Sequence, residues 1–261
     1  MPHIFSIPNV TRRAGIVWYR NLVVFVRTWQ VNFFPPLVEA LLYLFAIGIG
    51  IGTYVQQIDG IPYINFIAPA ILAIAVMNSA FFECTFGSFV RMYYQKTFDA
   101  MIATPLSIED VIAGELLWGA TRSVIYVIIM LPVLAVFGVV SLPLALLAIP
   151  LAFLGGLMFA GIAMCFTSVT PGIDTLNYPS FLFITPMALF SGTFFPLTLM
   201  PAFLQYFALA VLPLTHLVAI MRMLTLPSLS WTLLLHLAWI AVITAITCII
   251  SINLMRKRLI V

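Results

Sequence analysis

Charged residues are scarce in this chain of 261 residues: they make up 7% of it, whereas hydrophobic residues make up 64%. An ordinary soluble domain carries roughly 25% charged residues. So few charges cannot cover a surface that faces water, so the composition excludes a soluble globular fold. The formal net charge is only +3, and the basic residues are scattered, which excludes nucleic acid as a partner.

Cysteine and lysine are also rare. Cys84, Cys165 and Cys248 lie in separate apolar runs, without the spacing of a disulfide framework or a metal site, and are expected to be small buried side chains. Neither Lys96 nor Lys257 follows a glycine-rich turn, so the chain has no phosphate loop. We therefore predict no cofactor, nucleotide or metal site in this chain.

A catalytic centre is not indicated either. Four acidic residues lie close together in the sequence: Asp99, Glu109, Asp110 and Glu115. No nucleophile or metal pattern accompanies them, and we expect them to flank a short cytoplasmic helix. His216 and His236 are lone histidines in apolar runs, where a core or interface position is expected. The sequence predicts that the chain is not an enzyme.

Long apolar runs are what the sequence has instead. A membrane-spanning helix needs about 20 apolar residues. Six such segments lie near residues 34–54, 63–90, 110–139, 142–169, 178–195 and 231–255. Pro35 and Pro36 are expected in the first turn of the first span, and Ser107 with Asp110 resembles a capping box before the third. We predict one all-α integral membrane domain, 1–261, with six transmembrane helices.

Two amphipathic segments are too polar to span. Residues 10–30 predict an interfacial helix with Trp18, Tyr19 and Trp29 at headgroup level, or a charged leader to the first span, rather than a removable signal peptide. Residues 97–109 predict a short helix that is capped by Thr97 and ends at Thr104 and Pro105.

A third segment, 191–227, is apolar but is broken by prolines into pieces too short to cross a bilayer. Such pieces predict re-entrant or interfacial helices.

The distribution of basic residues predicts the orientation. In a six-span arrangement nine of the eleven Lys and Arg residues fall on one side, which is cytoplasmic by the positive-inside rule. Both termini and the 97–109 element are then cytoplasmic, and the 191–227 segment is external.

Two features lie inside the predicted spans. Glu83 and Arg122 are costly in lipid, so we expect a mutual ion pair, with a role on the translocation path or displaced span boundaries as alternatives. Gly48 and Gly52 form a GxxxG pair that either lets a neighbouring helix approach closely or adds flexibility.

The segment SGTFFPLTLMPAFLQYFALAVLPLTHLVAIMR, residues 191–222, resembles the C-terminal signature of ABC type 2 permeases. That signature has a small residue, Phe-Pro, then Leu-Pro-x-Thr-His and a basic residue. The matching positions are Ser191, Gly192, Phe195, Pro196, Pro213, Thr215 and His216. The stretch 96–119 further resembles the nodulation-type lipo-oligosaccharide and drug exporter branch.

The resemblance implies a bacterial inner-membrane exporter of a lipid-linked glycan, lipo-oligosaccharide, drug or lipid-like molecule. Its implied partners are a second copy of itself, with Gly48 and Gly52 at the contact, and two cytoplasmic ATPase subunits that carry ATP and magnesium. The resemblance makes 97–104 the coupling helix. Its implied contact residues are Thr97, Phe98, Asp99 and Met101, with Phe98 as an apolar anchor and Asp99 as a polar contact.

Two other function classes remain open on the sequence. One is a secondary transporter driven by an ion gradient, against which the few intramembrane acids and the lack of a visible inverted repeat count. The other is a membrane scaffold that transports nothing.

Overall fold

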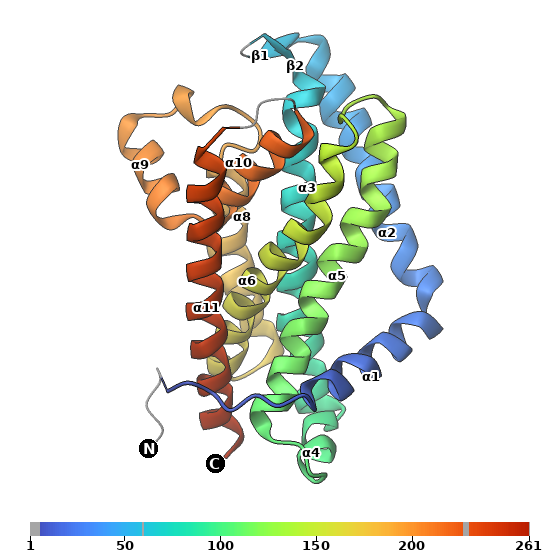
Figure 1. Ribbon diagram of the computed structural model, residues 1–261, viewed down its shortest axis with the longest axis vertical. Coiled ribbons are helices and arrows are strands. Elements are labelled where there is room, and N and C mark those ends of the chain that lie inside the picture. The colour runs from blue at the N-terminus through green and yellow to red at the C-terminus, as the bar shows by residue number, and fades with distance from the viewer. Residues whose placement is uncertain (1–5, 59, 227–229, 261) are drawn as a thin grey trace.

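The computed structural model describes residues 6–58, 60–226 and 230–260. In these ranges the chain forms a bundle of long helices with a small two-stranded sheet at one end (Figure 1). The sheet pairs β1 (Gln57–Ile58) antiparallel with β2 (Ile61–Pro62). At the opposite end lies the short helix α4 (Thr97–Ile102). We call these two ends the sheet end and the α4 end.

The N-terminal part forms two helices. α1 (Ala14–Arg27) runs across the α4 end and packs on α5, and α2 (Trp29–Tyr43) rises to the sheet end through η1 (Leu44–Gly50) and η2 (Ile51–Thr53). Trp18 points into the bundle, since its Nε1 donates to Thr121 Oγ1 at 2.9 Å, whereas Tyr19 and Trp29 are exposed.

Pro35 and Pro36 lie inside α2, not in its first turn, so that detail of the prediction is wrong. The helix begins earlier, where Asn32 Nδ2 donates to Thr28 O at 2.9 Å. A span tolerates the missing backbone donors when its neighbours satisfy the freed carbonyls.

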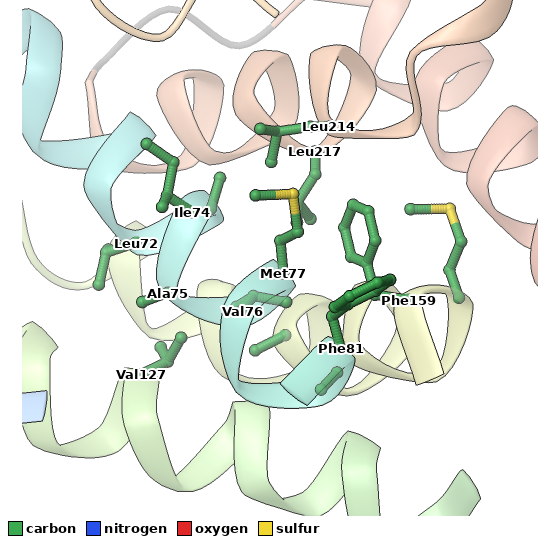
Figure 2. Packing of buried hydrophobic residues seen from close by; sticks show 14 of the residues in the cluster. Leu72, Ile74, Ala75, Val76, Met77, Phe81, Val127, Phe159, Leu214 and Leu217 are labelled. Carbon is green, nitrogen blue, oxygen red and sulfur yellow. The ribbon is translucent and has the colours of Figure 1, made fainter. Parts of the chain in front are cut away.

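α3 (Tyr63–Phe82) is the central helix and continues through η3 (Glu83–Gly87) and η4 (Val90–Tyr94) to the α4 end. In the most apolar 18-residue stretch of the continuous helix Tyr63–Tyr94, 83% of the residues are buried. In the corresponding stretch of α11 (Thr232–Leu259), 11% are buried. In Figure 2, Met77 lies beneath Leu214 and Leu217 of α10, and Phe81 lies beside Phe159 of α6. The outer helix α11 presents an apolar surface suited to lipid.

α5 (Ile108–Val136) and α6 (Ala148–Val169) complete the main bundle, with η5 (Leu144–Leu147) leading into α6. Ser107 Oγ accepts the Asp110 N–H at 3.1 Å, so the predicted cap of this helix is confirmed. α6 packs against both α5 and α11.

The predicted fifth span is shorter in the structure. The helix there is assembled from α7 (Asn177–Pro179), η7 (Ser180–Ile184) and α8 (Thr185–Phe190), after η6 (Ile173–Leu176). Its 14 residues cover about 21 Å at 1.5 Å each, less than the roughly 30 Å of a bilayer core. The helix ends before Gly192, whose φ is +70°, a left-handed conformation that suits a helix end.

The segment after α8 folds into η8 (Leu197–Leu199), α9 (Ala202–Val211) and α10 (Pro213–Thr225). α9 and α10 meet at 90° near the sheet end (Figure 1). Pro227, at the end of the predicted 191–227 segment, lies outside the described residues. The described residues contain five helices long and apolar enough to span, or six if the bent pair counts as one.

Both ends of the described chain lie at the α4 end (Figure 1). Ser6 Oγ donates to Asn253 Oδ1 of α11 at 3.1 Å, and Asn253 Nδ2 donates back to Ser6 O at 2.7 Å. The two chain ends and the α4 loop therefore share one side of the bundle.

Replacing Gly114 with alanine is expected to displace α1 from α5. A Cβ at this position would lie 2.5 Å from Val17 Cβ and 2.7 Å from the backbone oxygen of Ala14. Because a backbone atom cannot change rotamer as a side chain can, the whole of α1 must shift. Overpacking of this kind costs about 1–3 kcal/mol. Thermal unfolding and limited proteolysis between α1 and α2 would measure it. Gly172→Ala is the control, since nothing lies within 4 Å of that Cβ; equal stability of the two variants would contradict the expectation.

Candidate functional site

A buried ionic cluster occupies the half of the bundle nearer α4, and we define it as Glu83, Arg91, Glu115 and Arg122. Glu83 of η3 is paired with Arg122 of α5 and with Arg91 of η4, whose Nη1 lies 2.8 Å from Glu83 Oε1. Trp118 Nε1 also donates to Glu83 Oε1 at 3.1 Å. The pair expected from the sequence thus exists within a larger network.

Glu115 is the most buried member, with a side chain that is 0% exposed. Its Oε2 accepts from Arg91 Nε and from Ser88 Oγ, each at 2.9 Å, and its Oε1 accepts from Asn21 Nδ2 of α1 at 2.8 Å. A buried charge is tolerable only when it is paired and hydrogen-bonded in this way.

One sequence expectation is therefore wrong. Glu115 does not flank a short cytoplasmic helix; it belongs, with Arg91, to the ionic cluster. Helical spacing was the available signal, since Glu115 and Arg122 are seven residues apart and Glu83 and Arg91 are eight apart, which places each pair on one helix face. The cluster ties η3 and η4 to α5, and the hydrogen bond from Asn21 adds α1.

α4 differs from its prediction in two respects. Thr97 is the first helical residue rather than the cap, because Lys96 precedes it in a left-handed conformation with φ 52°. Phe98 is fully buried in the chain's own core, so its ring braces α4 against the bundle and is not presented to a partner. Met101 packs against the same core.

The exposed surface of α4 is formed by other residues. Asp99 is 60% exposed and lies 3.9 Å from the exposed Lys96. The exposed residues of this region are Tyr93, Tyr94, Gln95, Lys96, Asp99, Ala100, Ala103, Thr104 and Pro105. Arg91 and Tyr94 share η4, so the ionic cluster and the exposed surface are joined by one helical turn.

Three adjacent cavities that share lining residues run along α3 and its continuation in η3 and η4. The first, of about 400 Å³, lies beside the ionic cluster and is lined by α1, α2, η3, η4 and α5. The second, of about 420 Å³, shares Glu83, Gly87 and Arg122 with it, and the third, of about 380 Å³, shares Asn78 and Phe82 with the second. We call this series the trough. Its α4 end is polar, and its far end, against α8, is mostly apolar.

The signature segment is held by Arg222 of α10. Its Nη2 donates to Gly192 O at 2.6 Å and its Nε to Phe66 O at 3.3 Å, while the guanidinium lies 3.8 Å from the Phe66 ring centroid. Arg222 thus fastens the loop after α8 to the start of α3. It is the basic residue of the signature, yet sequence reasoning assigned it no role.

The other signature residues are mostly buried. Pro213 opens α10, and the buried members are Ser191, Gly192, Pro196, Pro213, Thr215 and His216, whereas Phe195 is exposed.

The two histidines, which are far apart in the sequence, are paired in the structure, and His216 is buried as expected. His216 Nδ1 lies 2.7 Å from His236 Nδ1 of α11, and His216 Nε2 lies 2.9 Å from Leu209 O. The His216 ring also stacks on Trp239 with centroids 4.0 Å apart. These contacts join α9, α10 and α11 at the sheet end.

Gly48 and Gly52 face a helix of the same chain. A Cβ on Gly48 would lie 2.8 Å from Ile64 Cγ1 of α3, and one on Gly52 would lie 4.0 Å from Tyr63 Cδ1. The close approach that the GxxxG pattern predicts is therefore made by α3, and the implied role at a contact between copies does not match this packing.

The chain is similar to a known protein family and to individual known proteins. The family model described as ABC-2 type transporter matches residues 13–226. Nodulation protein J of Bradyrhizobium diazoefficiens is 34% identical over 243 residues, covering 93% of this chain and 92% of the relative, and that of Sinorhizobium fredii is 32% identical with the same coverage.

A more distant relative comes from another genus. Inner membrane transport permease YadH of Escherichia coli is 27% identical over 198 residues, covering 72% of this chain and 73% of the relative. No solved structure matches the chain significantly. The long apolar helices and these matches together show that the chain belongs to the ABC-2 type transporter family, as a multi-pass membrane permease.

Proposed function

We propose that the chain is the permease of an ATP-driven exporter whose ATPase is a separate protein. The observation that carries this proposal is α4, a short helix at one end of the bundle that is braced by the buried Phe98 and exposes Asp99. A helix fixed in this way transmits a push to the bundle without unfolding. Family membership supports the pairing with an ATPase.

The proposed mechanism runs from α4 to the trough. Closure of two ATPase subunits around ATP would move α4, and η4 would carry the motion to Arg91 and the ionic cluster. Because the cluster joins η3, η4 and α5, and through Asn21 also α1, its displacement would change the shape of the trough. Nucleotide can drive this switch only if it favours one of the two conformations.

The orientation and setting are part of the proposal. The α4 end contains Lys96 and the basic C-terminal turn of α11, with Arg256, Lys257 and Arg258, which favours a cytoplasmic position for both termini and the bacterial inner membrane as the location. ATP and magnesium would bind to the ATPase subunits.

The substrate class follows from the trough. A polar end and a largely apolar end suit an amphiphile, and we propose a lipo-oligosaccharide, lipid-linked glycan, drug or lipid-like molecule. The relatives named nodulation protein J and transport permease are consistent with this range.

Transport in proteoliposomes tests the function. The permease reconstituted with its ATPase should move substrate only with hydrolysable ATP, and an ATPase variant without its catalytic carboxylate should abolish movement. Transport that follows an imposed ion gradient without ATP would establish the secondary transporter instead, and no movement under either condition would favour the scaffold.

A second copy is expected to contact α2. Val38 and Leu42 are 45% and 62% exposed on this helix, and Phe181 and Leu182 are 70% and 75% exposed on η7, so α2 and η7 present the apolar surface that a dimer would bury. Leu42→Cys is expected to form disulfide-linked dimers in native membranes, at a yield several-fold above Val242→Cys on α11, which is 57% exposed. Equal or reversed yields on gels would contradict this interface.

A further inference from the structure

Glu39 is an intramembrane carboxylate that sequence analysis passed over. It lies in the apolar helix Trp29–Thr53, ten residues from one end and fourteen from the other. At 1.5 Å per residue, it is about 15 Å and 21 Å from the two ends. Within the described residues Glu39 makes no ion pair within 4.0 Å and no hydrogen bond.

Asn78 faces the same space. It lies fifteen residues from the start and sixteen from the end of the helix Tyr63–Tyr94, and its amide has no hydrogen bond among the described residues. Glu39 and Asn78 line the second cavity of the trough together with Ser79, Tyr126 and the Phe82 ring. Two unpartnered polar groups from different helices therefore meet in one cavity at mid-span depth.

The charge of this cavity is not balanced. Arg122 lines it too, but its guanidinium is paired with Glu83, which leaves the Glu39 carboxylate without a counter-ion. An ionisable group at membrane depth is costly unless it meets water or a partner, and such groups mark transport pathways. A ligand that donates hydrogen bonds would satisfy Glu39, whereas an anion would add like charge.

The neutral groups around Glu39 narrow the ligand further. The amide of Asn78 and the hydroxyl of Tyr126 can each donate and accept hydrogen bonds, whereas the Ser79 hydroxyl already donates to Val76 O. Hydroxyl groups of a ligand also donate and accept hydrogen bonds, so a polyhydroxylated headgroup complements the cavity. The third cavity continues from Phe82 between residues such as Ile74, Phe181 and Leu189, which provides an apolar path for a chain.

The second copy that is expected to contact α2 and η7 is a poor occupant for the cavity itself. In a two-fold contact the same surface faces itself on both copies. Direct packing over the cavity would bring two unpartnered Glu39 carboxylates into one apolar interface, and buried unpaired charges are strongly unfavourable. The cavity is better filled by a ligand.

We propose that Glu39 and Asn78 form a headgroup site at mid-span in the trough that accepts uncharged, polyhydroxylated amphiphiles and rejects anionic ones. The inference rests on the proposed function, since it specifies a selectivity of the export path. It assigns Glu39 the role of charge filter, with Asn78 as the neutral contact beside it.

Binding of matched amphiphiles tests the site without ATP. The permease in phosphatidylcholine nanodiscs is labelled with a photoreactive dodecyl maltoside, and unlabelled dodecyl maltoside, dodecyl phosphate and dodecyltrimethylammonium compete. Label is expected on peptides of α2, α3 and η7 to α8, with dodecyl maltoside competing at a concentration at least ten-fold lower than dodecyl phosphate. Stronger competition by the ammonium compound, or label confined to other helices, would overturn the proposal.

A variant of Glu39 separates the effect of the side chain's charge on amphiphile binding from the effect of its shape. Glu39→Gln keeps the size and hydrogen bonding of the side chain, so dodecyl maltoside binding should stay within about three-fold while dodecyl phosphate gains ten-fold or more. Glu109→Gln is the matched control, because Glu109 pairs with Arg256 at the α4 end and lines none of the three cavities of the trough. An unchanged preference in Glu39→Gln, or the same change in Glu109→Gln, would disprove the filter.

The outcome is independent of the test of ATP-driven export. Labelling uses neither ATP nor the ATPase, so loss of the headgroup site with intact ATP-dependent transport overturns only this inference. Selective labelling without ATP-dependent transport overturns only the proposed function.

Discussion

Replacing Arg91 with alanine is expected to lower the free energy of unfolding by about 3–5 kcal/mol, the usual cost of leaving a buried charge without its partner. Glu83 would keep Arg122, but Glu115 would keep only the neutral donors Ser88 and Asn21 in a site that is 0% exposed. The midpoint of thermal unfolding, followed by size-exclusion chromatography in one detergent, would measure the loss.

Two further variants give this prediction its control. Arg91→Ala combined with Glu115→Gln should recover part of the stability, because the second change removes the orphaned charge and keeps a hydrogen-bonding side chain. Lys96→Ala, at a side chain that is 65% exposed, should change stability by less than about 0.5 kcal/mol. If the double variant is less stable than Arg91→Ala, the ion pair of Arg91 and Glu115 is not what stabilises the ionic cluster.

The sequence predicted the class of fold because the span signal is local. Apolar runs of sufficient length identified five of the helices, and the Ser107 cap depends only on residues three positions apart. The ion pair of Glu83 and Arg122 was predictable since neither charge is tolerable alone in lipid. These features need no knowledge of which helix lies beside which.

The features that the sequence missed all depend on contacts between distant segments. The apolar run 178–195 continues past Phe190, but the helix ends there, where Gly192 turns and Arg222 holds its carbonyl. The GxxxG pattern predicted a close neighbour without identifying it as Ile64 of α3.

The same holds for the polar side chains of the spans. His216 and His236 are lone in the sequence and meet only because α10 packs on α11. Glu39 was passed over within an apolar run, and its significance depends on Asn78 lying across the cavity from another helix. Positions of this kind require the tertiary arrangement.

Reversing the charge of Asp99 is expected to reduce both co-purification of the ATPase and ATP-driven export by ten-fold or more. Asp99 is exposed on α4, and its pair with Lys96 contributes little to folding because both side chains are largely in water. A like charge placed in a docking contact costs several kcal/mol, and about 1.4 kcal/mol already equals a factor of ten in affinity. The Asp99→Arg permease should therefore insert into the membrane and fold normally but fail to bind the ATPase.

Phe98 requires a separate variant, because its ring is buried in the bundle and not at the partner. Phe98→Ala is expected to cost about 3–5 kcal/mol of stability and to loosen α4, so that the ATPase still binds but hydrolysis no longer drives export. Asp174→Arg, the same charge reversal at another exposed position, is the control for Asp99→Arg. Normal co-purification and export in Asp99→Arg, or equal losses in Asp174→Arg, would show that α4 is not the docking element. If the ATPase docks on α4, a charge reversal on α4 must weaken its binding, and the same reversal elsewhere must not.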